Sequence, residues 1–321
     1  MPRVMRRKKS KKFGKKFGHF EDLPAELRMM IVDDMDPADR CRFARSSKSS
    51  QEEAKNSRKY IYSLELYGEH RDNIKIYVVH GEYRYNIDTG YFLNFCKEHG
   101  KYYMKYLNSD SEELWKNELD SSSQQFDLYQ YAGNYFEKLL QLYQNKIRKL
   151  KIKTFSKQFD ITSMTNLDIL ELKKYVESSH IISKLRRPLN TLEVSETETD
   201  QIVKSYEISK VENAFHIPDI KLNYQQFCEL QAKNIRVNIG TLTELDIIDF
   251  LRKWQNGTSW KELDLCEWSL EGSKFNRKTF LNFLGRYEEG FVFVDLGLNV
   301  QRRRGGLGCS DAHLFFNSYP T

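Results

Sequence analysis

The sequence contains few cysteines and no long apolar run. Its 321 residues include five cysteines, at positions 41, 96, 228, 266 and 309. This odd, scattered set argues against a disulfide framework and suits a reducing compartment. The mean hydropathy is −0.68, and no apolar stretch approaches the roughly 18 residues of a membrane span. The apolar segment that follows the charges of a secretory signal is also missing near the N-terminus. We therefore expect no membrane partner and a cytoplasmic or nuclear location.

Sequence motifs of catalysis are missing as well. The chain has no G-x-S-x-G, no H-E-x-x-H and no Gly-rich loop that ends in Gly-Lys-Ser/Thr. "RRRGGLG" (302–308) lacks the strand–loop–helix context of a phosphate-binding loop, so we interpret it as a solvated loop. The sequence thus predicts a non-enzyme with no catalytic residues and no cofactor.

Two cysteine–histidine pairs have the spacing of metal ligands. They are Cys96 with His99 and Cys309 with His313, and four such ligands could form a tetrahedral zinc site. The pairs lie more than two hundred residues apart, and neither has a C-x2-C partner. We instead expect Cys96 to pack in a helix, with His99 near its C-terminal end. No metal site is predicted.

Positive charge is concentrated at the N-terminus. Residues 1–18 hold nine of the 51 Lys and Arg residues and no acid, which leaves 42 basic against 45 acidic residues in the rest. Like charges repel, so residues 1–19 are expected to be a disordered tail. A cluster in the tail is typical of a nuclear-import patch, which binds the acidic groove of an import receptor. The same cluster could equally bind RNA phosphates or only solvate the chain. It comprises Arg6, Arg7, Lys8, Lys9, Lys11 and Lys12.

Residues 21–45 predict two short apolar helices. Pro24 suits a first helical turn, and Leu27, Met30, Ile31 and Met35 recur at helical spacing. Asp36-Pro37 should end this helix and begin the next. "SSKSS" (46–50) should break the pattern before a polar helix over 51–59. Burying each large apolar side chain is worth about 1.5–3 kcal/mol, so this segment needs a cover from the rest of the chain or from a partner.

Beyond residue 60, strands and helices are mixed. A hairpin is predicted over 73–87, with its turn at His80-Gly81. Helices are predicted over 130–148 and 241–257. Strands are predicted over 60–66, 149–155, 190–194, 220–224, 234–240, 261–268 and 291–298. Leucine and valine positions 28 or 29 residues apart indicate an irregular leucine-rich-repeat-like stack; they are Val194 and Leu222, Val237 and Leu265, and Leu265 and Val294. The expected fold class is α+β, with a small all-helical unit over 20–60 and a mixed domain over 61–321.

The spacing of residues 23–43 closely resembles an F-box, the small helical unit that binds the Skp adaptor of cullin–RING ubiquitin ligases. The matching positions are Leu23, Pro24, Glu26, Leu27, Ile31, Met35, Asp36, Pro37, Asp39, Arg40 and Phe43. Asp-Pro-x-Asp-Arg followed by Ser47-Lys48 looks like the nematode F-box proteins, and "LTELDIIDFLRKWQNGTSWKELDL" (242–265) is similar to the domain that follows the F-box in them.

This resemblance implies a receptor that tethers an unknown target protein for ubiquitination, with the Skp adaptor and, through it, cullin as partners. The adaptor would be bound through Leu23, Pro24, Leu27, Ile31, Met35, Pro37 and Phe43. The alternative is a nuclear RNA- or DNA-binding protein that acts through the basic tail, with binding that falls steeply with salt. The mildly acidic remainder makes nucleic acid the weaker interpretation. A third is a plain repeat scaffold whose N-terminal helices fold onto the body as a cap.

Overall fold

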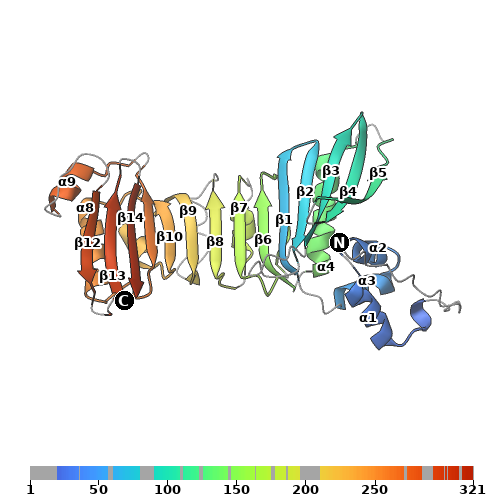
Figure 1. Cartoon of the computed structure of the whole chain (residues 1–321), viewed down its shortest axis with the longest axis horizontal. Coiled ribbons are helices and arrows are strands. Elements are labelled where there is room, and N and C mark those ends of the chain that lie inside the picture. Colours follow the sequence, from blue (N-terminus) through green and yellow to red (C-terminus); the bar gives the residue numbers. More distant parts are fainter. Residues whose placement is uncertain are drawn as a thin grey trace, which may run out of the picture. The chain divides into compact units, whose positions relative to one another are not determined.

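The computed structural model divides the chain into two compact units, residues 1–59 and 60–321 (Figure 1). The basic tail and its predicted import patch lie outside the described residues. The structure describes residues 20–35, 37–56, 61–79, 90–108, 111–122, 126–143, 146–162, 164–174, 178–185, 187–195, 210–270, 273–283, 292–299, 301, 303–310 and 313–320. No helix in these ranges is long and apolar enough to cross a membrane.

The first unit is helical. Its elements are the 3-10 helix η1 (Phe20–Asp22) and the α-helices α1 (Ala25–Asp34), α2 (Pro37–Ala44) and α3 (Lys48–Asn56). The boundary predicted at Asp36-Pro37 is confirmed, because α2 begins at Pro37. The break predicted at 46–50 is confirmed at Ser46 and Ser47, which lie between α2 and α3, but it is shorter than expected, because α3 already begins at Lys48. The Ser47 hydroxyl accepts a hydrogen bond from the backbone N–H of Ser50 (3.0 Å), so this serine-rich stretch starts α3 as a cap.

The second unit contains one 14-stranded sheet, in the order β12-β13-β14-β11-β10-β9-β8-β7-β6-β1-β2-β3-β4-β5. The strands are β1 (Ile61–His70), β2 (Asn73–Val79), β3 (Gly90–Glu98), β4 (Lys101–Asn108), β5 (Glu113–Glu118), β6 (Ile147–Lys153), β7 (Ile169–Lys173), β8 (Thr191–Ser195), β9 (Ala214–Lys221), β10 (Asn234–Asn238), β11 (Leu265–Ser269), β12 (Val292–Leu298), β13 (Arg303–Cys309) and β14 (His313–Pro320).

Strands β1 and β6 to β11 form a parallel centre, and antiparallel strands extend it at both ends. Apolar residues of equivalent position form a row across this centre. The row is Leu64, Leu150, Leu170, Leu192, Phe215, Ile235 and Cys266, all with 0% exposure. Hydrogen-bonded pairing thus gathers one buried residue from each strand into a continuous core.

The repeat interval predicted from the sequence is wrong. Val237 pairs with Trp268, not with Leu265, and Val294 lies on β12, where it pairs with Leu307 of an antiparallel neighbour. Leu222 follows the end of β9. The row instead steps by 20 to 31 residues from Leu150 to Cys266, because the connecting loops and helices differ in length.

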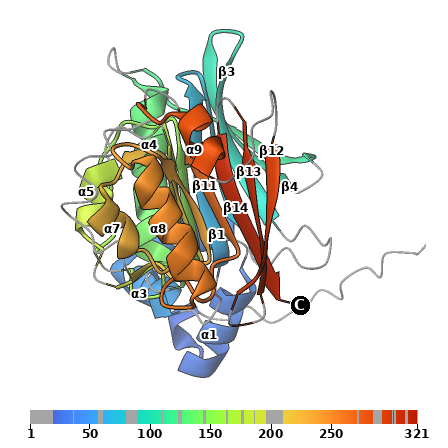
Figure 2. The same cartoon turned by 90° about the vertical axis from the view of Figure 1, so that its left-hand side faces the viewer.

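Helices cover one side of the sheet, where Figure 2 shows α4, α5, α7 and α8. The helices of this unit are α4 (Leu128–Tyr143), α5 (Ser178–Ser183), α7 (Tyr224–Cys228), α8 (Glu244–Gln255) and α9 (Arg277–Phe283). The helix predicted over 130–148 is confirmed as far as Tyr143 by α4. Of the four residues spaced four apart in its sequence, Tyr131, Tyr135, Leu139 and Tyr143, the last three are buried. The row of buried leucines faces these helices, and the next residue of each strand points to the other side.

Helix α8 begins with the capping box that the sequence predicts. Asp246 N–H donates to the Thr243 hydroxyl (3.3 Å), and Thr243 N–H donates to the Asp246 carboxylate (2.7 Å). The spacing of Leu245, Ile248, Leu251 and Trp254 in the sequence predicts one apolar face. This prediction needs correction, because Leu245 is 64% exposed. The buried face consists of Ile247, Phe250, Leu251 and Trp254, and its aromatic rings contact Trp268 and Phe316 of the sheet.

Two segments adopt strands that the sequence did not predict. "FLNFCKEHG", expected to be helical, belongs to β3 and ends in a turn at His99 and Gly100, both with positive φ. "RRRGGLG", expected to be a solvated loop, forms most of β13. Gly305 lies so close to Trp254 that an added Cβ would come within 2.4 Å of the indole ring. Gly305 therefore makes room for a bulky core residue within a strand.

The observed orientation of α8 predicts that a Leu→Ala substitution lowers the free energy of unfolding by different amounts on the two faces of the helix. Leu251→Ala should lower the free energy of unfolding by about 2–5 kcal/mol, because it leaves a cavity in the core. Leu245→Ala, on the exposed face of the same helix, should change it by less than about 0.5 kcal/mol. Urea denaturation followed by tryptophan fluorescence measures both. Equal losses would contradict this orientation of α8.

Candidate functional site

An exposed apolar surface lies on α1. Leu27, Met30 and Ile31 are 47%, 64% and 42% exposed, and they lie at positions i, i+3 and i+4 of the helix, which share one face. Large apolar side chains that gather on an exposed helix face mark a surface for binding another protein. We call these three residues the α1 apolar face.

The opposite side of α1 is anchored within its own unit. Val32 has 0% exposure. The Arg28 side chain pairs with Glu53 of α3 (Nε to Oε1, 2.7 Å) and donates to the carbonyl oxygen of Leu23 (3.2 Å). Since these contacts hold α1 from behind, the α1 apolar face stays exposed.

A buried arginine stabilises the turn between α1 and α2. Arg40 has 0% exposure, and its Nη2 donates to the carbonyl oxygens of Asp33 and Met35, both at 3.3 Å. These carbonyls end α1 and have no partner within that helix. Arg40 therefore fixes the angle at which the chain leaves α1.

The other residues predicted for adaptor binding lie near the ends of α1 and α2. Pro24 is exposed, whereas Leu23, Met35 and Phe43 are half-buried. Phe43 packs edge-on against Phe20, with ring centroids 4.9 Å apart, so part of its surface serves the unit itself. Pro37 begins α2, but its side chain lies outside the described residues.

Sequence reasoning left Met30 out of the predicted binding residues, although it is the most exposed member of the α1 apolar face. Its helical spacing from Leu27 and Ile31 was the signal that could have included it. Phe20, which begins η1 and packs on Phe43, was also missed. No periodicity in the sequence points to it.

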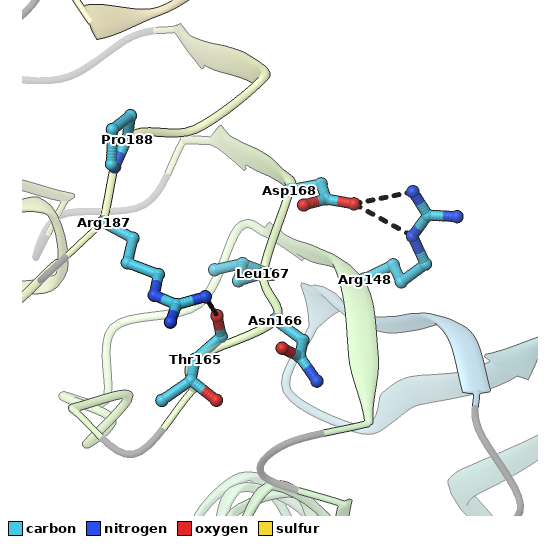
Figure 3. A pocket seen from close by; sticks show the side chains of 7 residues that line it. All are labelled: Arg148, Thr165, Asn166, Leu167, Asp168, Arg187 and Pro188. Carbon is cyan, nitrogen blue, oxygen red and sulfur yellow. Dashed lines mark hydrogen bonds and ion pairs between the residues drawn. The ribbon is translucent and has the colours of Figure 1, made fainter.

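A pocket of about 430 Å³ lies on the surface of unit 2, where β6, β7 and β8 begin. Asp168 accepts from Nε and Nη2 of Arg148 (2.9 and 2.8 Å), and Arg187 donates to the carbonyl oxygen of Thr165 (3.1 Å) (Figure 3). Its described lining is Arg148, Thr165, Asn166, Leu167, Asp168, Arg187 and Pro188. This set has one carboxylate and no histidine or cysteine, so it lacks the pair of groups needed for acid–base or nucleophilic catalysis.

The two cysteine–histidine pairs do not meet. Cys96 and His99 lie at β3, whereas Cys309 and His313 belong to β13 and β14, near the opposite end of the sheet. Within the described ranges, no three His, Cys, Asp or Glu side chains come together as metal ligands.

The comparisons with known proteins identify the helical unit. The family model described as "F-box domain" matches residues 20–62, which include α1, α2, α3 and the α1 apolar face. No curated protein matches the chain, and no solved structure matches it. The chain therefore contains an F-box domain. F-box domains bind the Skp adaptor, and the proteins that carry them are typically non-catalytic adaptors. The domain therefore suggests a substrate-adaptor role in a ubiquitin ligase.

Two arginines of α2 allow a matched test of the turn. Arg40→Met should lower the local unfolding free energy of residues 25–56 by about 1–3 kcal/mol, because two carbonyls lose their donor. Arg42→Met should have an effect below about 0.5 kcal/mol, since Arg42 is exposed and its pair with Asp39 is a surface contact. Hydrogen–deuterium exchange of these helices measures the difference, and equal protection in both variants would contradict the role of Arg40.

Proposed function

We propose that this protein is the substrate-receptor subunit of a Skp–cullin–F-box ubiquitin ligase. The observation that carries the proposal is the α1 apolar face, which is exposed within a matched F-box domain. Covering each of its three side chains would contribute about 1.5–3 kcal/mol before the costs of association. Residues at the ends of α1 and α2 would extend the contact; they are Leu23, Pro24, Met35, Pro37 and Phe43.

The second unit would supply the target-binding surface. Parallel strands that follow one another along the chain support a leucine-rich-repeat-like domain. We also propose that it corresponds to the associated domain of nematode F-box proteins. The resemblance of residues 242–265 supports this, and the structure forms α8 and the start of β11 there.

Such a receptor acts by tethering. One unit binds the Skp adaptor and thereby the cullin, and the other binds the target. The target's concentration beside a ubiquitin-charged enzyme rises to an effective value set by the linkage. No residue of this chain needs to take part in the transfer of ubiquitin.

The test replaces the centre of the α1 apolar face. Leu27→Asp with Ile31→Asp should weaken capture of purified Skp adaptor by at least about a hundredfold, because two carboxylates would have to be buried in an apolar contact. A pull-down at micromolar concentrations, followed by titration calorimetry, measures the loss.

A matched control carries the same two changes elsewhere. Leu114→Asp with Leu245→Asp alters two leucines that are 53% and 64% exposed outside the F-box domain and should leave capture intact. Capture that persists in the Leu27/Ile31 variant would refute the assigned face. Binding that disappears with added salt and with deletion of residues 1–18 would instead favour the basic tail as the binding element.

A further inference from the structure

A row of lysines crosses the side of the sheet that is opposite the helices. The seven neighbouring strands, in the order β7, β6, β1, β2, β3, β4 and β5, each contribute one residue to a row across the sheet. Each residue in this row is paired directly with the next; we call such a row a level of the sheet. The row reads Lys173, Lys153, Tyr67, Lys75, Asn94, Lys105 and Lys116. Five of the seven members are cationic. We call this set the lysine row.

The lysine row has the dimensions of a peptide-binding track. Neighbouring strands lie about 4.8 Å apart, so seven strands span about 29 Å. An extended polypeptide covers about 3.3 Å per residue, and roughly nine of its residues would cross the whole row. Of the helices described in unit 2, α4, α5, α7 and α8 lie on the other side of the sheet in Figure 2.

The carboxylates near the lysine row already have partners. Glu98 pairs with both Lys105 and Lys116, and these hydrogen bonds lower the pKa of Glu98 to about 2. Glu193 pairs with Lys173 (2.6 Å). Lys105 also pairs with Glu113 (3.4 Å), so two carboxylates already match the two lysines at that end of the row. A further anion would bind at Lys75 in the middle of the row.

In the neighbouring level of the sheet, Glu171 has cationic partners, whereas Glu65 bonds to neutral hydroxyls. Glu171 pairs with Lys149 (2.6 Å) and Lys151 (3.1 Å). Glu65 accepts hydrogen bonds from the hydroxyls of Ser63 and Tyr67, both at 2.7 Å. These carboxylates are therefore engaged within the sheet.

The middle of the row contains a pocket of about 240 Å³ with a cationic lining. Its described lining residues are Tyr67, His70, Asn73, Lys75 and Tyr77, and none of them is acidic. In the next strand, Asn94 lies beside Lys75 in the row. Its buried Oδ1 has no hydrogen-bond partner within the described part of the chain, and as an acceptor it suits a backbone N–H of a bound peptide. The pocket is wide enough for one carboxylate side chain and presents the Lys75 ammonium to it.

Aromatic rings border this pocket. Tyr77 stacks on Phe92 with ring centroids 5.2 Å apart, and Tyr67 meets Tyr77 edge-on at 5.2 Å. All three rings are half-buried, so each keeps some apolar surface for a ligand. The ring pair of Tyr77 and Phe92 lies one level away from the lysine row, within reach of a neighbouring side chain of the same bound segment.

We infer that the lysine row binds an acidic, extended segment of a target protein, with one carboxylate in the Lys75 pocket and an apolar side chain on Tyr77 and Phe92. The inference rests on the proposed function only in treating the bound segment as part of a ligase target. A peptide fits better than nucleic acid, because it can place neutral side chains over Glu65 and Glu171. A phosphate backbone has a charge at every nucleotide and would face those carboxylates as well.

The test measures binding of defined probes to the full chain by fluorescence anisotropy. The probes are a labelled peptide of about twelve residues made of Glu, Asp, Ser and one Leu, the same peptide with Gln and Asn in place of its acids, and an oligouridylate of equal length. The acidic peptide should bind, the amide peptide should bind at least about tenfold more weakly, and the oligouridylate should be the weaker of the two anionic probes.

Charge-reversed variants assign the binding to the face. Lys75→Glu with Lys153→Glu should weaken the acidic peptide by about tenfold or more. Lys138→Glu with Lys261→Glu, two exposed lysines on α4 and in the loop before β11, makes the same change in net charge and should alter binding less than about twofold. The basic tail is identical in all these proteins, so it cannot produce the difference. Lys75→Gln with Lys153→Gln repeats the test should the reversed variant fail to fold.

Three results would overturn the inference: equal losses in the two reversed variants, no preference for the acidic over the amide peptide, or tighter binding of the oligouridylate through the same lysines. Adaptor capture separates this inference from the proposed function. The Lys75/Lys153 variant should still bind the Skp adaptor, and the Leu27/Ile31 variant should still bind the acidic peptide.

Discussion

Backbone hydrogen bonding in register is the constraint on which the larger unit depends. Pairing of β1 with β6, and of each later strand with the next, places residues of equal position side by side. Because strand side chains alternate, the same register that forms the buried leucine row also forms the lysine row on the opposite side. A slip of one residue in any strand would move lysines into the core and leucines to the surface. Core and candidate binding surface therefore have a single physical origin.

The F-box unit solves a different problem, which is to keep apolar residues exposed on a folded helix. Its interior is small, with Val32 and Ala54 as fully buried apolar residues, so polar contacts fix the helices. Arg40 holds the turn through two carbonyls, and Arg28 ties α1 to α3 through Glu53. These interactions use the rear of α1 and leave its apolar face for another polypeptide.

The two candidate surfaces differ in chemistry, and this difference suits separate partners. The α1 apolar face depends on burial of apolar area and should respond little to salt. The lysine row depends on charge in a partly desolvated setting and selects by electrostatic complementarity. A receptor that binds both an adaptor and a target can use the α1 apolar face for affinity to the adaptor and the lysine row for selection of the target. The two partners then do not compete for one surface.

The sequence by itself determined the local features. Helical spacing located α1, the Asp36-Pro37 boundary located α2, and Thr243 with Asp246 located the start of α8, because caps and periodicity act within a few residues. Only the tertiary structure decided that "FLNFCKEHG" is a strand, that Gly305 of β13 packs against Trp254, and that Leu245 is exposed. It also decided which lysines share a level, since Lys75 and Lys153 are brought together by pairing between strands that are distant in the chain. Strand pairing and core packing are non-local, and no single segment encodes which neighbour it will meet.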